Sequence, residues 1–95
     1  MLNSYETLFI IRAGLDEEAS KALVDKFKNL LESSATLENM DEWGKRRLAY
    51  PVMDEMEGYY VLANFQSQSD FPAELERIFK ITDGILKYLI IKKEK

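Results

Sequence analysis

The chain has 95 residues, of which 46% are hydrophobic and 32% charged, and its formal net charge is -4. This length allows one domain with one core, and the balance of apolar and charged residues is typical of a folded globular protein. Because the chain lacks cysteine and histidine, thiolate chemistry is excluded and the commonest general base and metal ligand are missing. We therefore expect a non-enzymatic protein without a metal or cofactor.

No apolar run reaches the roughly 18 residues that cross a bilayer, and no signal segment is visible, so we expect a cytoplasmic location and no membrane partner.

Two short stretches are net positive within this acidic chain. Residues 44–52 carry three cations and no anion, and residues 87–95 carry four cations and one anion. If the fold brings the two stretches together, they form a local anion site that the net charge conceals. The alternative is two ordinary solvated clusters, and charge alone does not decide between them.

The first third of the chain predicts a strand followed by a helix. Residues 5–12 alternate, and one predicted face is suited to a core because it carries Tyr5, Thr7, Phe9 and Ile11. The opposite face is half apolar, which indicates a central strand. Asp16 then begins a predicted helix that runs to about Ser33 and carries an apolar stripe typical of a core-facing surface.

A long second strand is predicted from Thr36 to Val52. Its acidic first half, with Glu38, Asp41 and Glu42, is expected to project or to pair loosely. In the second half, the period of two places Arg46 and Arg47 on opposite faces. Pro51 cannot donate to a ladder, so this is predicted to be an edge strand, where cations also protect against self-pairing.

The remaining elements are a hairpin loop at residues 54–58, a strand at 59–66, a helix and a final strand at 85–92. The third strand places Val61, Ala63 and Phe65 on one face, and Tyr60, Leu62 and Asn64 on the other. Asp70 is the predicted helix cap, and Gly84 is the predicted left-handed stop after the second helix. The tail at 93–95 is expected to be flexible.

The order β-α-β-β-α-β predicts a single α+β domain over residues 1–95 with the ferredoxin-like arrangement. This arrangement is a four-stranded antiparallel sheet with two helices on one face. The other face is then predicted to show an apolar surface large enough to require a partner protein. We assign this surface to Leu8, Ile10, Tyr60, Leu62, Leu89 and Ile91.

One sequence run makes the chain recognisable, namely Gly44-Lys45-Arg46-Arg47-Leu48-Ala49-Tyr50-Pro51-Val52. Together with the element order, the opening Tyr5-Glu6-Thr7-Leu8-Phe9-Ile10-Ile11 and Gly58-Tyr59-Tyr60, it resembles the family of the sixth protein of the bacterial small ribosomal subunit. The resemblance covers residues 4–92, and the Arg-Arg-Leu-Ala-Tyr-Pro run is its most specific part.

The resemblance implies a non-catalytic assembly function on the ribosome. Members of this family pair with the eighteenth small-subunit protein, and the heterodimer binds the central domain of the small-subunit ribosomal RNA. The partner is then expected on the apolar sheet face. The RNA-binding candidates are Lys45, Arg46, Arg47, Lys87, Lys92 and Lys93. One of Arg46 and Arg47 is expected to touch RNA and the other to lie against the partner or the sheet rim.

Two alternatives share this order of elements. An RNA-recognition motif would need aromatic residues on the open face that stack bases, and Tyr60 is the one good candidate there, because Phe9 and Phe65 are predicted to face the core. A ferredoxin-like domain that binds a small regulatory ligand would need convergent polar groups in a cleft. Asp54, Glu55 and Glu57 are candidates for such a cluster, but on a loop without histidine we expect them to be solvated hairpin charges.

Overall fold

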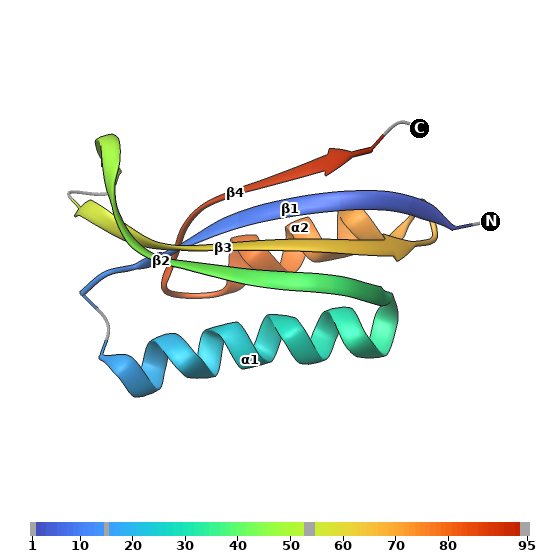
Figure 1. The fold of residues 1–95 in the computed structure, drawn as a ribbon, viewed down its shortest axis with the longest axis horizontal. Coiled ribbons are helices and arrows are strands. Elements are labelled where there is room, and N and C mark those ends of the chain that lie inside the picture. Colours follow the sequence, from blue (N-terminus) through green and yellow to red (C-terminus); the bar gives the residue numbers. More distant parts are fainter. Residues whose placement is uncertain (1, 15, 53–54, 94–95) are drawn as a thin grey trace.

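The chain folds into one four-stranded sheet and two helices, as a computed structural model that describes residues 2–14, 16–52 and 55–93 shows (Figure 1). For residues 49–52 and 55 only the backbone is described. The elements are β1 (Asn3–Arg12), α1 (Glu17–Ser34), β2 (Thr36–Val52), β3 (Glu55–Ser67), α2 (Phe71–Ile81) and β4 (Ile85–Lys92). The sheet has the order β2-β3-β1-β4 and all its pairs are antiparallel, so the predicted fold class is confirmed.

The core lies between the sheet and the helices, which cover the same face (Figure 1). At its centre the rings of Phe9, Phe27 and Phe79 join β1, α1 and α2, and the Phe27 and Phe79 centroids are 4.6 Å apart. The predicted core residues of β1 and β3 are all buried. Thr7 is the polar member of this face, and its hydroxyl donates to the Leu89 carbonyl oxygen at 2.9 Å. Because that bond satisfies the buried hydroxyl, Thr7 is tolerated in the core.

The two helices begin differently, although both have an aspartate at the N-cap. Asp16 has an extended backbone, and its carboxylate accepts a hydrogen bond from the Ala19 backbone N–H at 2.7 Å, as predicted. Asp70 lies at the N-cap of α2, as predicted, but it has a helical backbone with φ -90° and ψ -16° and its side chain makes no cap bond. At the other end of α2, Gly84 has the predicted positive φ, +95°, two residues beyond the C-cap Thr82.

Strand β2 spans the predicted range and lies at the edge of the sheet, as expected. Its acidic half does not pair loosely, however, because Asp41 and Glu42 are in register with Leu62 and Val61 of β3. The ladder accommodates this half through register shifts, one of them between Glu42 and Gly44, where Gly44 has φ +82°. Beyond Gly44 the strand rises from the sheet on the side away from α1 (Figure 1).

Gly58 belongs to β3 and not to the predicted hairpin loop, of which Asp54 lies outside the described residues. A Cβ atom at this position would lie 2.2 Å from Ile10 Cγ2 and 3.6 Å from Leu48 Cδ2. Glycine is therefore required here for packing, because a side chain would displace its neighbours, and it is not required for a turn.

Candidate protein and RNA interface

The sheet face away from the helices, called here the open face, carries a continuous aliphatic patch. Leu8 is in register with Leu62 on one side and Leu89 on the other, and Ile91 lies one row further along β4. Leu89 and Ile91 are 51% and 46% exposed, which is high for aliphatic residues. We name Leu8, Leu62, Leu89 and Ile91 the aliphatic patch. Exposed apolar residues that adjoin in this way mark interaction sites on protein surfaces.

Ile10 and Tyr60 are on the same face, but they are partly or fully covered by the chain itself. Ile10 is only 6% exposed and packs with Leu48, Leu86 and Tyr60 in a second small core. Leu48 reaches this position because the end of β2 rises on this side of the sheet (Figure 1). Ile10 is therefore buried beneath other side chains of the open face and is not part of its exposed surface.

Trp43 lies on the open face, where its ring contacts Tyr60, and it is not among the site residues predicted from the sequence. Its ring stacks on Tyr60 with centroids 6.3 Å apart and an angle of 11° between the planes. The Arg46 guanidinium carbon lies 5.4 Å from the Trp43 ring centroid, within cation–π distance. Trp43 is 41% exposed. Trp, Tyr and Arg are the residue types most enriched at interface hot spots. The position of Trp43 directly beside the basic run was the sequence signal that could have identified it as an interface residue.

The predicted cations are divided between the two faces of the sheet. Arg46 pairs with Gly58 and Lys87 pairs with Ile10, so both belong to the open face. Lys45 and Arg47 pair with Tyr59 and Glu57, and therefore belong to the opposite face. Arg46 and Arg47 thus point in opposite directions, as predicted.

The C-terminal lysines lie far from the basic run of β2. Lys92 pairs with Tyr5, and the Lys93 backbone N–H donates to the Ser4 carbonyl oxygen at 2.8 Å. Tyr5 is seven residues along β1 from Arg12, the residue in register with Gly58. This separation amounts to about 24 Å of strand. Among the described cations of the C-terminal stretch, only Lys87 therefore lies at the end of the sheet that carries Arg46.

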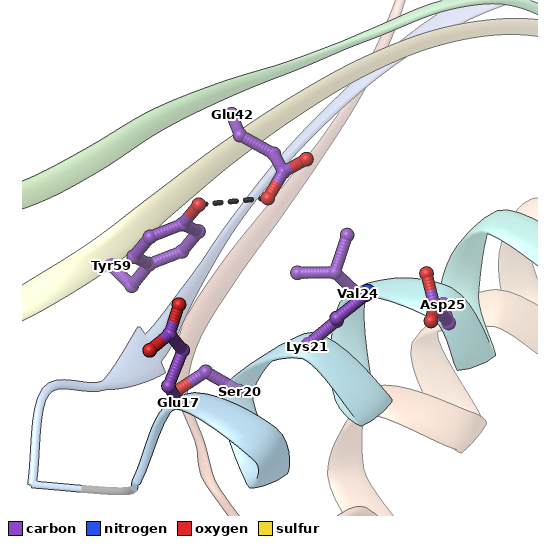
Figure 2. Close-up of a pocket in the computed structure, with 7 residues that line it drawn as sticks. All are labelled: Glu17, Ser20, Lys21, Val24, Asp25, Glu42 and Tyr59. Atoms are coloured by element: carbon purple, nitrogen blue, oxygen red, sulfur yellow. Dashed lines mark hydrogen bonds between the residues drawn. The ribbon is translucent and has the colours of Figure 1, made fainter.

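A small pocket between α1 and the β2–β3 pair is lined mainly by acidic and polar residues (Figure 2). The Tyr59 hydroxyl donates to Glu42 Oε1 at 2.7 Å, and this bond, with some burial and the carboxylate charge, raises the pKa of Tyr59. The other side chains that line the pocket are Glu17, Ser20, Lys21, Val24 and Asp25. The volume of this pocket is about 280 Å³.

Two further observations limit what the arrangement can do. Over residues 2–14, 16–52 and 55–93, no group of three or more acidic side chains is placed to hold a metal ion. Phe9 and Phe65 are fully buried on the helix side, so neither stacks with a base on the open face as the RNA-recognition-motif alternative requires.

Comparison with known proteins adds the family to this geometry. A family model described as ribosomal protein S6 matches residues 4–92. The chain belongs to the ribosomal protein S6 family. Among its relatives in that family is the small ribosomal subunit protein bS6 of Clostridium novyi, which is 50% identical over 95 residues and matches 99% of this chain and 100% of its own length. The bS6 protein of Caldanaerobacter subterraneus is 52% identical over 92 residues, with coverage of 96% and 97%.

A solved S6 structure has the same fold. The crystal structure of 30S ribosomal protein S6 from Thermotoga maritima matches with a TM-score of 0.92 at 25% identity, and covers 98% of this chain and 89% of that one. The S6 resemblance drawn from the basic run is thus confirmed over almost the whole chain. As for membranes, neither α1 nor α2 is long and apolar enough to span one.

Proposed function

We propose that the chain is a structural, non-catalytic constituent of the small ribosomal subunit in the cytoplasm. It pairs through its open face with the eighteenth small-subunit protein, and the heterodimer binds the central domain of the small-subunit ribosomal RNA. Membership of the S6 family and relatives named as small ribosomal subunit proteins support the first part. The aliphatic patch is the observation that carries the second part.

The aliphatic patch supports a protein partner on energetic grounds. Covering about 500 Å² of apolar surface at about 25 cal/mol per Å² contributes about 12 kcal/mol before the costs of association. The acidic net charge of the chain, -4, fits a division of labour in which the partner brings most of the positive charge to the RNA. The chain itself contributes a docking surface and a few cations.

Leu89→Asp tests the partner site. A buried, unpaired carboxylate in the patch is costly, so the affinity for the eighteenth protein, measured by titration calorimetry, should fall by more than about tenfold. Ile81→Asp is the matched control, because Ile81 is 68% exposed on α2, on the opposite side of the sheet. Equal affinities of the Leu89→Asp variant and the unmodified chain would place the partner elsewhere.

The RNA part has its own test. Replacing Arg46 and Arg47 together by alanine should weaken binding of the heterodimer to the RNA central domain and flatten its salt dependence, because counterion release falls with each lost phosphate contact. Unchanged binding at low and moderate salt would exclude this basic run as an RNA contact.

A further inference from the structure

Trp43 is the additional residue of a β-bulge in strand β2. The ladder pairs Glu42 with Val61. The next pair, Gly44 with Tyr60, advances one residue along β3 but two along β2, so Trp43 has no counterpart in β3. Gly44 has φ +82°, although a Cβ atom at this position would have open space around it. Glycine is therefore needed here for the backbone conformation of the bulge and not for space.

The Trp43 side chain contributes little to the interior of the protein. Among the described residues it belongs to neither cluster of buried hydrophobic side chains, and much of its surface is exposed. A bulge interrupts the hydrogen bonds of a ladder, and bulges are found where they direct a side chain to a particular place. Because the inserted side chain does not build the core, its purpose lies at the surface.

Two neighbours restrain the Trp43 ring. The ring lies nearly parallel to that of Tyr60, and the Arg46 guanidinium lies over it. Tyr60 in turn packs against the second small core of the open face. A side chain that is already restrained loses little conformational freedom when a partner covers it. Trp43 is therefore prepared to act as an anchor, and tryptophan is among the residues that dominate the energy of protein interfaces.

Trp43 also borders the aliphatic patch. Tyr60, on which the ring stacks, lies on the same face of β3 as Leu62 and two residues from it, about 7 Å along the strand. Leu62 is in register with Leu8, and Leu8 with Leu89. Apolar side chains thus cross the open face from β2 to β4, and Trp43 lies at the β2 end of this band.

The charges beside the band favour a protein over a nucleic acid as its occupant. Asp41 is in register with Leu62, and Glu6 is in register with Ile91, so both acidic residues belong to the open face. A polyanion that approached the band would be repelled by these carboxylates. A protein with an apolar surface can bury the band and leave the carboxylates at its rim, which is the usual arrangement of a protein interface.

We infer that Trp43 is an anchor residue for the eighteenth small-subunit protein, and that the bulge at Gly44 serves to present it. This inference rests on the proposed function and extends the docking surface from the aliphatic patch onto β2. The surface fits a partner that packs an apolar side chain on the indole ring and offers a carboxylate to Arg46. The carboxylate is required because a guanidinium that a partner covers must keep a hydrogen-bond acceptor.

Trp43 is the only tryptophan of the chain, which allows a direct test without any substitution. The full chain is produced with 5-fluorotryptophan, so that its fluorine-19 NMR spectrum contains one signal, and the unlabelled eighteenth protein is added. The signal should move, and the difference between its positions in H2O and D2O, which measures solvent contact, should be largely lost. A signal that stays unchanged while the heterodimer forms would overturn the inference. A signal that changes only when RNA is added to the heterodimer would also overturn it, because the ring would then contact RNA.

The energetic weight of Trp43 is measured by titration calorimetry with the eighteenth protein. Trp43→Ala should weaken the affinity by about thirtyfold or more, which is the loss that marks a hot spot. Trp43→Phe should restore part of this loss, because it keeps a ring against Tyr60. Ile81→Ala is the control, since Ile81 is exposed on α2, and it should change the affinity by less than about threefold. Equal affinities of Trp43→Ala and Ile81→Ala would overturn the anchor role.

Deletion of Trp43 tests the purpose of the bulge. Without this residue Glu42 and Gly44 are adjacent, and their pairs with Val61 and Tyr60 follow one another as in a regular ladder. The deletion should therefore leave the midpoint of urea unfolding unchanged or higher, while the affinity for the partner falls as in Trp43→Ala. A midpoint lowered as far as in Leu48→Ala, which removes a buried side chain, would show that the bulge serves the fold and not the partner.

The proposed function and this inference fail in different ways. If the unmodified chain forms no complex with the eighteenth protein, the proposed function is wrong and the inference falls with it. If the complex forms, and Leu89→Asp abolishes it while the fluorine signal of Trp43 does not respond to the partner, the inference alone is wrong. Thermal unfolding of each variant confirms that these comparisons are made between folded proteins.

Discussion

At the scale of single residues, Gly58 determines how closely β1 and the end of β2 approach. The sequence predicts a turn at this glycine because it follows a short polar stretch, and turns are the commonest setting for glycine. The close contact with Ile10 depends on a strand 48 positions earlier in the chain, and no local pattern reports it. Residues whose role is tertiary contact are the ones that sequence patterns miss.

Gly58→Ala should destabilise the protein by about 1–3 kcal/mol, the usual cost of overpacking. The new Cβ atom would lie 2.2 Å from Ile10 Cγ2, so Ile10 or a strand must move. Urea unfolding measures the loss. The control is the same substitution in an Ile10→Ala background, where it should cost much less; an equal cost in both backgrounds would contradict the contact.

Tyr59 should titrate above its ordinary pKa of 10.0, because its hydroxyl donates to Glu42 and its ionised form would face that carboxylate. Glu42→Gln should lower the Tyr59 pKa, as measured by NMR of ring-labelled tyrosine, with Tyr59→Phe identifying the resonance. Below the ordinary pKa, Tyr59 keeps its proton in both the folded and the unfolded state, so the hydrogen bond contributes its full stabilisation of the fold. This contribution is lost as the pH rises through the higher pKa of the folded state, where Tyr59 in the fold also loses its proton. An unchanged pKa in Glu42→Gln would show that the bond is not the main cause.

At the scale of elements, periodicity and end signals predicted the secondary structure closely. The predicted ranges of β2 and β4 match the observed strands, and β4 begins directly after Gly84. The loose pairing expected for the acidic half of β2 is wrong, because this half pairs with β3 in a ladder, interrupted by register shifts, that outweighs weak strand propensity. Local sequence rules correctly predicted the positive φ of Gly84. They also placed Asp70 at the start of α2, but they did not show that its side chain makes no cap bond.

Asp16→Ala should destabilise the protein by about 0.5–2 kcal/mol, because it removes the acceptor for the Ala19 backbone N–H at the start of α1. Asp70→Ala is a matched control at the start of α2, where the aspartate makes no cap bond. Thermal unfolding compares the two. A larger loss for Asp70→Ala than for Asp16→Ala would contradict the capping geometry.

At the scale of the whole molecule, the sequence predicts which faces of the sheet are covered, but only part of what the open face does. The period of two correctly assigned Leu8, Leu62 and Leu89 to one face. It could not show that Leu48 covers Ile10, because this depends on the upward course of β2 after Gly44. The sequence also could not predict how far Lys92 and Lys93 lie from Arg46, because this distance depends on the register of β4 and β2 in the sheet.

Partner binding should stabilise the whole fold by linkage. With the eighteenth protein at about 100 times its dissociation constant, the gain is about 2.7 kcal/mol, which corresponds to a rise in Tm of about 10–20 °C for a domain of this size. The rise should disappear in Leu89→Asp and persist in Ile81→Asp, as followed by differential scanning calorimetry. A rise of equal size in both variants would mean that the partner does not use the aliphatic patch.

The pairing of β4 with β1 has a consequence for the order of events during synthesis. The described strand that is made last closes on the one that is made first, through Thr7 to Leu89, Lys93 to Ser4 and Arg12 to Gly84. Until β4 has left the ribosome that makes it, β1 has an unpaired edge and the aliphatic patch lacks Leu89 and Ile91, half of its members. A partner that recognises the patch would therefore find only half of its surface on a chain in which β4 has not yet been made and paired.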